Sequence, residues 1–228
     1  MFMKKEIFRF RRILLIVFPI LAGASVIIGN IMLSHQFDTS MVYYMYSYIA
    51  QYFLLYFSVA YWGVEFQKKT INLLIISGQS HMDLYVAKFL TYILHILIFF
   101  LCSYFEVAFY CLLTKQNIAL METFLSMLGA YIMYGSFSYT CSTIIVMMTK
   151  KFVISLVASW MLMSIVPAVT MILQGTIIEN CLKYIPFSFI VEVFSFSKYT
   201  AEQFVITMIW VILANFIGYF MLVKRGRV

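Results

Sequence analysis

The chain has 228 residues, of which 64% are hydrophobic, 19% aromatic and 11% charged. Soluble domains average about 45–50% apolar and about 25% charged residues, so this composition excludes an ordinary soluble protein and indicates an integral membrane protein. The formal net charge of +7 would suggest a nucleic-acid partner for a soluble protein, but basic loops that face anionic lipid explain it here without nucleic acid.

Long windows with no charge, or with one, predict how often the chain crosses the membrane. Residues 1–12 mix five basic side chains with Ile and Phe, which is typical of a short interfacial helix. The apolar run that follows is long enough to cross and too long for the core of a signal peptide. Five further windows each exceed the roughly 20 residues that a spanning helix needs. These windows lie between Asp38 and Glu65, over 89–113, between Glu122 and Lys150, between Lys151 and Glu179, and between Glu202 and Lys224. We therefore predict an all-α integral membrane protein with six transmembrane helices in a single domain, 1–228.

Tyrosines repeat along the second predicted span at Tyr44, Tyr48, Tyr52 and Tyr56. A spacing of four places them along one face of a helix. The outer members fit an aromatic belt at the membrane surface. Tyr52 and Tyr56 lie deeper, where a hydroxyl needs a partner or water, so they are candidates for lining a substrate path.

The polar segment between the second and third spans, 65–88, is the part around which the chain is organised. Its pattern predicts two short amphipathic helices with a break at Gly78, the second beginning after Ser80, because Ser80 and Asp83 form a capping-box pattern. Glu65 marks the point where the chain leaves the membrane, and we expect its carboxylate near Lys68, Lys69 or a basic residue of a partner. Such a segment suits docking to a partner, although a plain connector is the alternative.

This segment resembles the cytoplasmic loop of type-2 ABC exporter permeases, which contains a coupling helix that seats in a groove of the ATPase subunit. The matching positions are Glu65-Phe66, Thr70-Ile71, Leu74, Ser77, Gly78, Ser80 and Lys88. Two positions depart from the pattern: Lys69 stands where the family often has Gly, and His81 where it usually has Arg. The resemblance covers about a tenth of the chain and implies partner-coupling roles for the residues Glu65, Phe66, Thr70, Ser77, Gly78, Ser80 and His81.

Three later spans carry further candidates. Glu106 is the only charge in the third span, and an intramembrane carboxylate is a functional candidate, although it could also reach the outer interface. His95 in the same span fits a hydrogen-bonded packing residue. The fourth span is rich in Gly, Ser and Thr, which let helices approach closely. In the fifth, Trp160 and Met163 belong to a Met-containing surface whose flexible side chains suit either variable apolar substrates or packing.

The segment 174–202 is too apolar for a free loop and too charged to span. We expect re-entrant or interfacial helices broken at Pro186, which agrees with the resembling family. Orientation follows from the basic residues, which collect on the cytoplasmic side of membrane proteins. With the N-terminus inside, 13 of the 16 lie on that side, and only Lys115, Lys183 and Lys198 lie outside. Both termini are therefore expected in the cytoplasm.

No sequence pattern for catalysis is present: there is no G-x-x-x-x-G-K-[ST] motif and no metal, paired-carboxylate or Ser/His/Asp arrangement. We expect a permease subunit that is not an enzyme and holds no cofactor, with ATP and Mg²⁺ bound by a partner ATPase. The resemblance implies a second permease subunit and a plasma-membrane exporter of hydrophobic or amphipathic peptides, for bacteriocin export or self-immunity. The alternative is a non-pumping binding module, such as a vitamin-binding S-component or a direct immunity protein. An intramembrane protease is disfavoured.

Overall fold

The computed structural model describes residues 39–71, 80–115, 119–173 and 182–225, together with positions 17, 20, 23, 24, 27 and 28. Apart from the turns and short connections between helices, these residues are helical, with no strand among them, which confirms the all-α prediction. The long helices are α3 (Thr39–Gln67), α5 (His81–Thr114), α6 (Leu120–Thr149), α7 (Phe152–Ile172) and α10 (Ala201–Arg225). Two short elements, η1 (Pro186–Ser188) and α9 (Ile190–Phe196), lie between α7 and α10.

Three of these helices are long and apolar enough to cross a membrane: His81–Thr114, Phe152–Thr170 and Ala201–Lys224. Helices α3 and α6 have 29 and 30 residues, but their many Tyr, Ser and Thr side chains lower the mean hydropathy. The first predicted span lies largely, and the interfacial helix 1–12 entirely, outside the described residues. The structure therefore supports a membrane protein, and the number of six spans stays a prediction.

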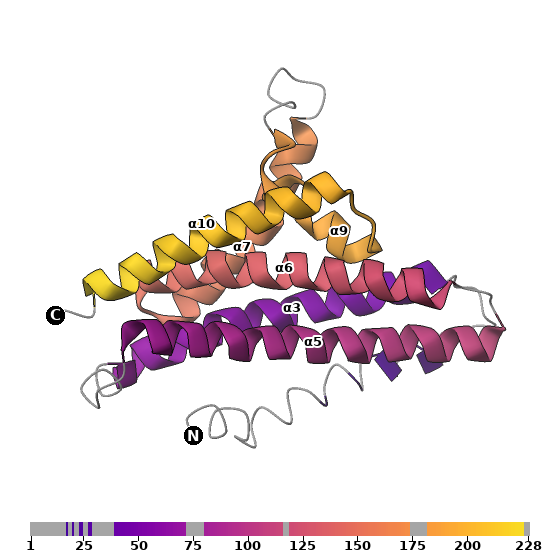
Figure 1. Cartoon of the computed structure of the whole chain (residues 1–228), viewed down its shortest axis with the longest axis horizontal. Helices are drawn as coiled ribbons and strands as arrows, with labels where there is room; N and C mark the ends of the chain where they lie inside the picture. Colours follow the sequence, from indigo (N-terminus) through magenta and orange to yellow (C-terminus); the bar gives the residue numbers. More distant parts are fainter. Residues whose placement is uncertain are drawn as a thin grey trace.

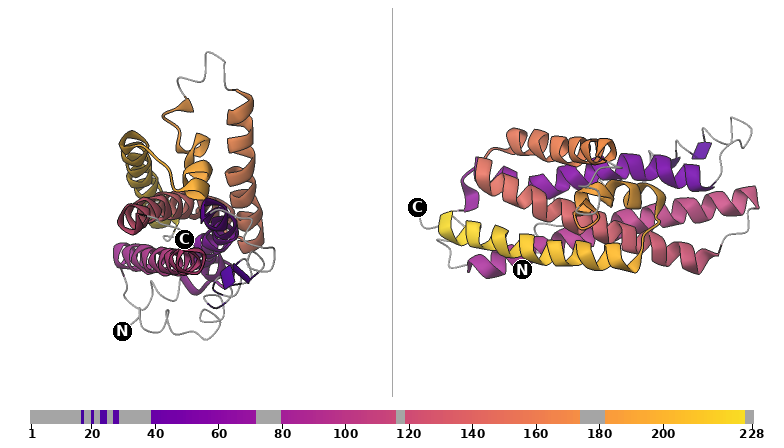
Figure 2. Two further views of the ribbon diagram at one scale, coloured as in Figure 1. Left: turned by 90° about the vertical axis from the view of Figure 1, so that its right-hand side faces the viewer. Right: turned by 90° about the horizontal axis from the view of Figure 1, so that it is seen from above.

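Helix α6 is the centre of the bundle. It packs against α3, α5, α7, α9 and α10, and lies between α5 and α10 in the view of Figure 1. Helix α7 lies at the edge of the bundle against α3 and α6, as the two views of Figure 2 show. Small residues permit this packing: a Cβ on Gly135 would collide with the side chain of Ile96. The Ser58 and Ser142 hydroxyls are 2.8 Å apart between α3 and α6. The prediction that small residues in this span serve close packing is confirmed.

The segment after α7 lies against the bundle along η1 and α9. Pro186 is the first residue of η1, and Phe187 packs on Phe137 with ring centroids 4.7 Å apart. Phe194 of α9 stacks on Tyr134 at 4.3 Å. Tyr134 is 14 residues into α6, or about 21 Å along its axis at a rise of about 1.5 Å per residue. The segment thus reaches the middle of α6, and a re-entrant arrangement in the membrane stays a prediction.

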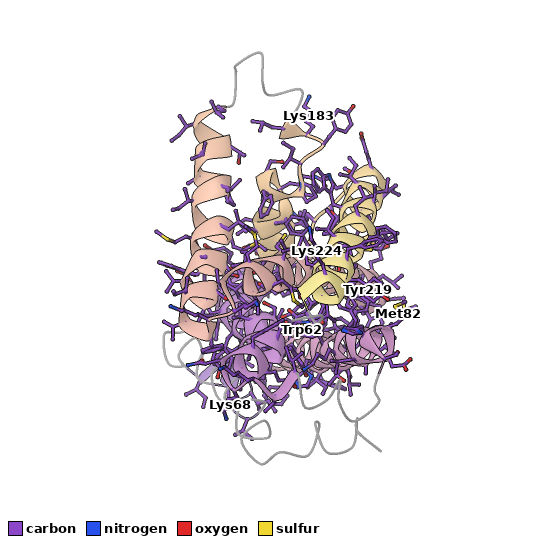
Figure 3. All side chains as sticks on the ribbon, turned by 90° about the vertical axis from the view of Figure 1, so that its left-hand side faces the viewer. Trp62, Lys68, Met82, Lys183, Tyr219 and Lys224 are labelled. Atoms are coloured by element: carbon purple, nitrogen blue, oxygen red, sulfur yellow. The ribbon has the colours of Figure 1, made fainter. Side chains whose placement is uncertain are left out.

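The up-and-down course of the long helices gathers basic residues at one end. Lys68, Lys69, Lys88, Lys150 and Lys224 lie where α3, α6 and α10 finish and α5 starts, whereas Lys115 and Lys198 lie at the opposite end. Figure 3 is viewed from the basic end, where Trp62, Lys68, Met82 and Lys224 are labelled, and Lys183 is labelled at the top of that view.

This arrangement predicts the sides from which single cysteines react. In a background without the native cysteines, cysteines placed at Lys68 and Lys150 should react with a membrane-impermeant maleimide from the cytoplasmic face only. Cysteines at Lys198 and Glu202 should react from the outer face only, because the antiparallel helices place them at the other end. Labelling of right-side-out and inverted vesicles is the measurement. If Lys68 and Lys198 react from the same side, the predicted topology is wrong, and if their sides are exchanged, the predicted orientation is wrong.

Candidate functional site

A buried ion pair closes the base of the segment 65–88. The Oε1 atom of Glu65, on the last turn of α3, lies 2.7 Å from the Nζ atom of Lys88 on α5. The two side chains are only 15% and 5% exposed. The Lys88 ammonium also donates to the backbone carbonyl of Tyr61 at 2.7 Å and lies 5.0 Å from the centre of the Trp62 ring. The pair thus joins the two helices that flank the segment.

The partner of Glu65 differs from the one expected from the sequence. Lys68 and Lys69 are exposed beyond the end of α3, whereas Lys88 is two turns into α5 on the side that faces α3. Glu65 therefore pairs with Lys88 rather than with its sequence neighbours. The buried ammonium of Lys88 needs a buried counter-ion, whereas the exposed Lys68 and Lys69 do not, and this explains why Glu65 pairs with Lys88.

Hydrogen bonds fix the helices beneath this pair. The Tyr61 hydroxyl lies 2.9 Å from Nδ1 of His95, and the same nitrogen lies 2.9 Å from the Thr91 carbonyl oxygen. The Trp62 indole N–H donates to the Tyr139 hydroxyl on α6 at 2.9 Å. The expectation that His95 is a hydrogen-bonded packing residue is confirmed. The base of the segment is consequently a rigid three-helix junction.

The first part of the segment turns sharply after α3. Lys69 has φ +55°, in the left-handed region that glycine adopts most readily, and the Thr70 hydroxyl donates to the Glu65 carbonyl at 3.4 Å. The half-buried Phe66 ring packs at 6.4 Å from Trp62. Two of the predicted coupling residues, Ser77 and Gly78, lie outside the described residues.

The second part of the segment is the start of α5. Ser80 is its N-cap and accepts a hydrogen bond from the Asp83 backbone N–H at 3.0 Å, so the predicted helix start is confirmed. The following helix runs without a break to Thr114. The expectation of a separate second short helix is therefore wrong. The reason is that Lys88, the charge that would have marked a boundary, is neutralised by Glu65 and buried inside the helix packing.

His81 stands at the first position of α5. It is partly exposed, and its Nε2 atom is buried with no hydrogen-bond partner among the described residues. His81 thus lies beside the Ser80 cap at the start of α5.

The four predicted path residues do not form one surface. Tyr52 is 40% exposed, and its hydroxyl donates to that of Tyr48 at 3.0 Å. Trp160 on α7 is also exposed and lies close to the Tyr52 hydroxyl. By contrast, Tyr56 packs edge-on against Phe152 at 5.8 Å, and Met163 is buried. The structure therefore brings together Tyr52 and Trp160 only.

Sequence reasoning missed the roles of Tyr61 and Trp62 and the partner of Lys88. One signal was present: residues 61, 62 and 65 lie three and four apart, so they share a face of α3. A lysine among apolar residues, as at position 88, also predicts a buried acidic partner, because a buried ammonium is costly without one. The distance in sequence between 65 and 88 hides their pairing.

No family model matches the chain, and no curated protein matches it either.

Proposed function

We propose that this protein is the transmembrane permease subunit of an ATP-driven exporter, and that residues 65–88 dock onto a separately encoded ATPase subunit. Its substrates would be hydrophobic or amphipathic peptides, exported for toxin secretion or self-protection. Both termini would be cytoplasmic, in the plasma membrane. The observation that carries the proposal is the buried Glu65–Lys88 pair, which ties the ends of the segment to each other.

A rigid base distinguishes a docking element from a plain connector. Burying two charges costs desolvation free energy, and a loop that only joins two helices needs no such pair. A clamped segment transmits force, because any displacement of it must move α3 and α5 together. Rigid-body movement of packed helices is one of the usual routes by which a binding event at one site changes another.

The backbone at Lys69 bears on one position of the resemblance, and the same left-handed conformation ends α5, α6 and α9 at Lys115, Lys150 and Ser197. In the family that the segment resembles, this position often carries glycine, and here Lys69 adopts a glycine-like φ of +55°. A left-handed conformation costs a non-glycine residue roughly 1–2 kcal/mol. The turn geometry is thus consistent with the resemblance even where the residue departs from the pattern.

The exposed face of α3 suggests where a second subunit or a substrate would lie. The exposed side chains of α5 and α10 are mostly aliphatic or Phe, as suits lipid: Leu90, Leu101, Phe105, Ile212, Leu213 and Phe216. On α3 the exposed side chains include Tyr44, Tyr48 and Tyr52, whose hydroxyls need water or protein partners. This face supports a route or a permease–permease interface, so we propose a dimer.

The protein would bind no nucleotide itself, and ATP and Mg²⁺ would be held by the ATPase. The test is reconstitution: the full chain should co-purify with a cytoplasmic ATPase that carries a G-x-x-x-x-G-K-[ST] motif and should stimulate its ATP hydrolysis. If no ATPase co-purifies with the chain, the alternative of a non-pumping binding module is favoured.

The tyrosine stripe gives a paired prediction. Tyr52→Ala should reduce peptide export or protection several-fold without changing thermal stability, because the ring is exposed and packs mainly on Tyr48. Tyr56→Ala should instead lower stability by about 2–4 kcal/mol, since it removes a ring packed on Phe57 and Phe152. Export assays and unfolding in detergent are compared for both variants. Equal loss of stability in both would show that Tyr52 is a packing residue.

A further inference from the structure

A cavity of about 380 Å³ opens at the end of the bundle opposite to the basic one. The turn η1 contacts α7, α9 and α10, and the cavity lies among these elements and the residues that lead into η1. Thr170, two residues before the end of α7, and Glu202, the second residue of α10, both line it. All of its lining residues belong to the described parts of the chain. The volume is in the range of small-ligand sites.

Hydrogen bonds hold the walls of this cavity in place. The Ser188 hydroxyl lies 2.8 and 2.7 Å from the carbonyl oxygens of Leu182 and Ile185, which fixes the turn η1. At the start of α10, Thr200 and Gln203 form a capping box: the backbone N–H of each donates to the side-chain oxygen of the other, at 2.9 and 3.2 Å. The cavity is therefore formed before any ligand binds.

Charges of both signs line the cavity. Glu192 of α9 and Glu202 of α10 contribute two carboxylates, and Lys183, labelled in Figure 3, contributes one ammonium. The three side chains are exposed, and none has an ion-pair or hydrogen-bond partner among the described residues. A ligand that carries both a cationic and an anionic group complements these charges. A purely cationic ligand would instead be repelled by Lys183.

Two exposed aromatic residues mark the level of this cavity in the membrane. Tyr184 lines the cavity, and its backbone carbonyl accepts a hydrogen bond from the Trp210 indole N–H at 2.9 Å. The two side chains are 60% and 42% exposed, and exposed Tyr and Trp collect at the membrane–water interface. Trp210 is nine residues from the start of α10, or about 14 Å at a rise of about 1.5 Å per residue. Because α10 is long and apolar enough to cross a membrane, the cavity between Trp210 and the helix start lies at the level of the lipid headgroups.

An apolar face of α10 leads from the cavity toward the middle of the membrane. Ile206 lines the cavity, and Ile209, Trp210 and Leu213 follow it at helical spacings of three, four and seven residues. Ile209 and Leu213 are 52% and 55% exposed, so this face is open to acyl chains. A ligand with a charged head and apolar chains fits the cavity and this face together.

From these observations we infer that the cavity binds the headgroup of a phospholipid that carries a primary ammonium group, as phosphatidylethanolamine does. Glu192 and Glu202 bind its ammonium, and Lys183 binds its phosphate. One acyl chain lies along the apolar face of α10. Phosphatidylcholine has no N–H donor for the carboxylates, and phosphatidylglycerol has no cation. A divalent metal is a poorer fit, because the described residues hold no group of three acidic, His or Cys side chains.

Lipid titration tests the site. The purified full chain, freed of native lipid in detergent, is titrated with dioctanoyl-phosphatidylethanolamine, and the rise in thermal stability gives an apparent Kd. We expect saturable stabilisation, with the matching phosphatidylcholine and phosphatidylglycerol binding about fivefold more weakly or worse. Phosphoethanolamine, which lacks the acyl chains, should bind about tenfold more weakly or worse.

Three outcomes overturn the inference. Equal binding of the three lipids would leave only a general lipid effect. Binding of phosphoethanolamine as tight as that of the lipid would assign the cavity to soluble zwitterions. Saturable stabilisation by a lysine-rich amphipathic peptide, with none by phosphatidylethanolamine, would assign it to a peptide.

Variants test the charged residues. Glu192→Gln combined with Glu202→Gln should weaken phosphatidylethanolamine binding about tenfold and strengthen phosphatidylglycerol binding, because the partners of the ammonium and the repulsion of the anionic lipid are both removed. Lys183→Gln should weaken the binding of both lipids. Glu122→Gln, an exposed acid at the same end that does not line this cavity, is the matched control and should stay within about twofold of wild type. The inference fails if the double variant keeps the wild-type preference for phosphatidylethanolamine. The assay uses no ATPase, so its outcome is independent of the exporter proposal.

Discussion

Glu65→Ala is expected to lower the free energy of unfolding by about 3–5 kcal/mol, the usual cost of removing one partner of a buried ion pair. The substitution leaves the Lys88 ammonium, which is 5% exposed, without its counter-ion. The Tyr61 carbonyl and the Trp62 ring remain, but neither carries a negative charge. Lys88→Met should cost less, because its apolar chain can fill the space and only the Glu65 carboxylate is left unpaired.

A double-mutant cycle measures the pair itself. In Glu65→Ala combined with Lys88→Met no buried charge is left, so the double variant should be more stable than the sum of the single losses implies, by about 1–3 kcal/mol. Lys150→Met, an exposed lysine at the same end, is the control and should change stability by less than about 0.5 kcal/mol. Unfolding in mixed detergent is the measurement. Additive losses, or single losses below 1 kcal/mol, would contradict a buried pair that holds α3 to α5.

The local features of this site could be predicted from the sequence because they depend on few residues. Ser80 and Asp83 lie three apart, so the helix start at His81 follows from capping chemistry alone. The Glu65–Lys88 pair could not be predicted in this way. It depends on how α3 and α5 pack along their length, and periodicity does not report the register of one helix against another.

The tyrosine stripe shows a second limit of pattern reasoning. A step of four residues turns about 40° more than one full helical turn, so three steps rotate the face by about 120°. Tyr44 and Tyr56 therefore point in different directions, although each neighbouring pair in the stripe is close. This rotation places Tyr52 on the exposed surface and Tyr56 against Phe152. Similarly, α5 is apolar enough to cross a membrane by mean hydropathy, whereas the Tyr-rich α3 of similar length is not.

Gly78→Pro is expected to abolish the stimulation of ATP hydrolysis by the permease. The sequence predicts a break between two helices at Gly78, and proline fixes φ near −65° and so excludes the left-handed conformation that ends a helix at glycine. Gly78 is at least ten residues from both Glu65 and Lys88 in the sequence, so we expect the protein still to fold and insert. Ser80→Ala should be milder, because an N-cap contributes about 1 kcal/mol. Lys198→Ala, at the opposite end of the bundle, is the control and should stimulate the ATPase like wild type.

The rate of ATP hydrolysis by the co-purified ATPase in proteoliposomes tests the docking of 65–88 most directly. It is measured with wild type, Gly78→Pro and Lys198→Ala at equal amounts of inserted permease, with and without peptide. Docking through 65–88 predicts that wild type and Lys198→Ala stimulate hydrolysis and that Gly78→Pro leaves it at the rate of the ATPase alone. Stimulation by Gly78→Pro equal to that by wild type would contradict it, and would reduce the segment to a connector between α3 and α5.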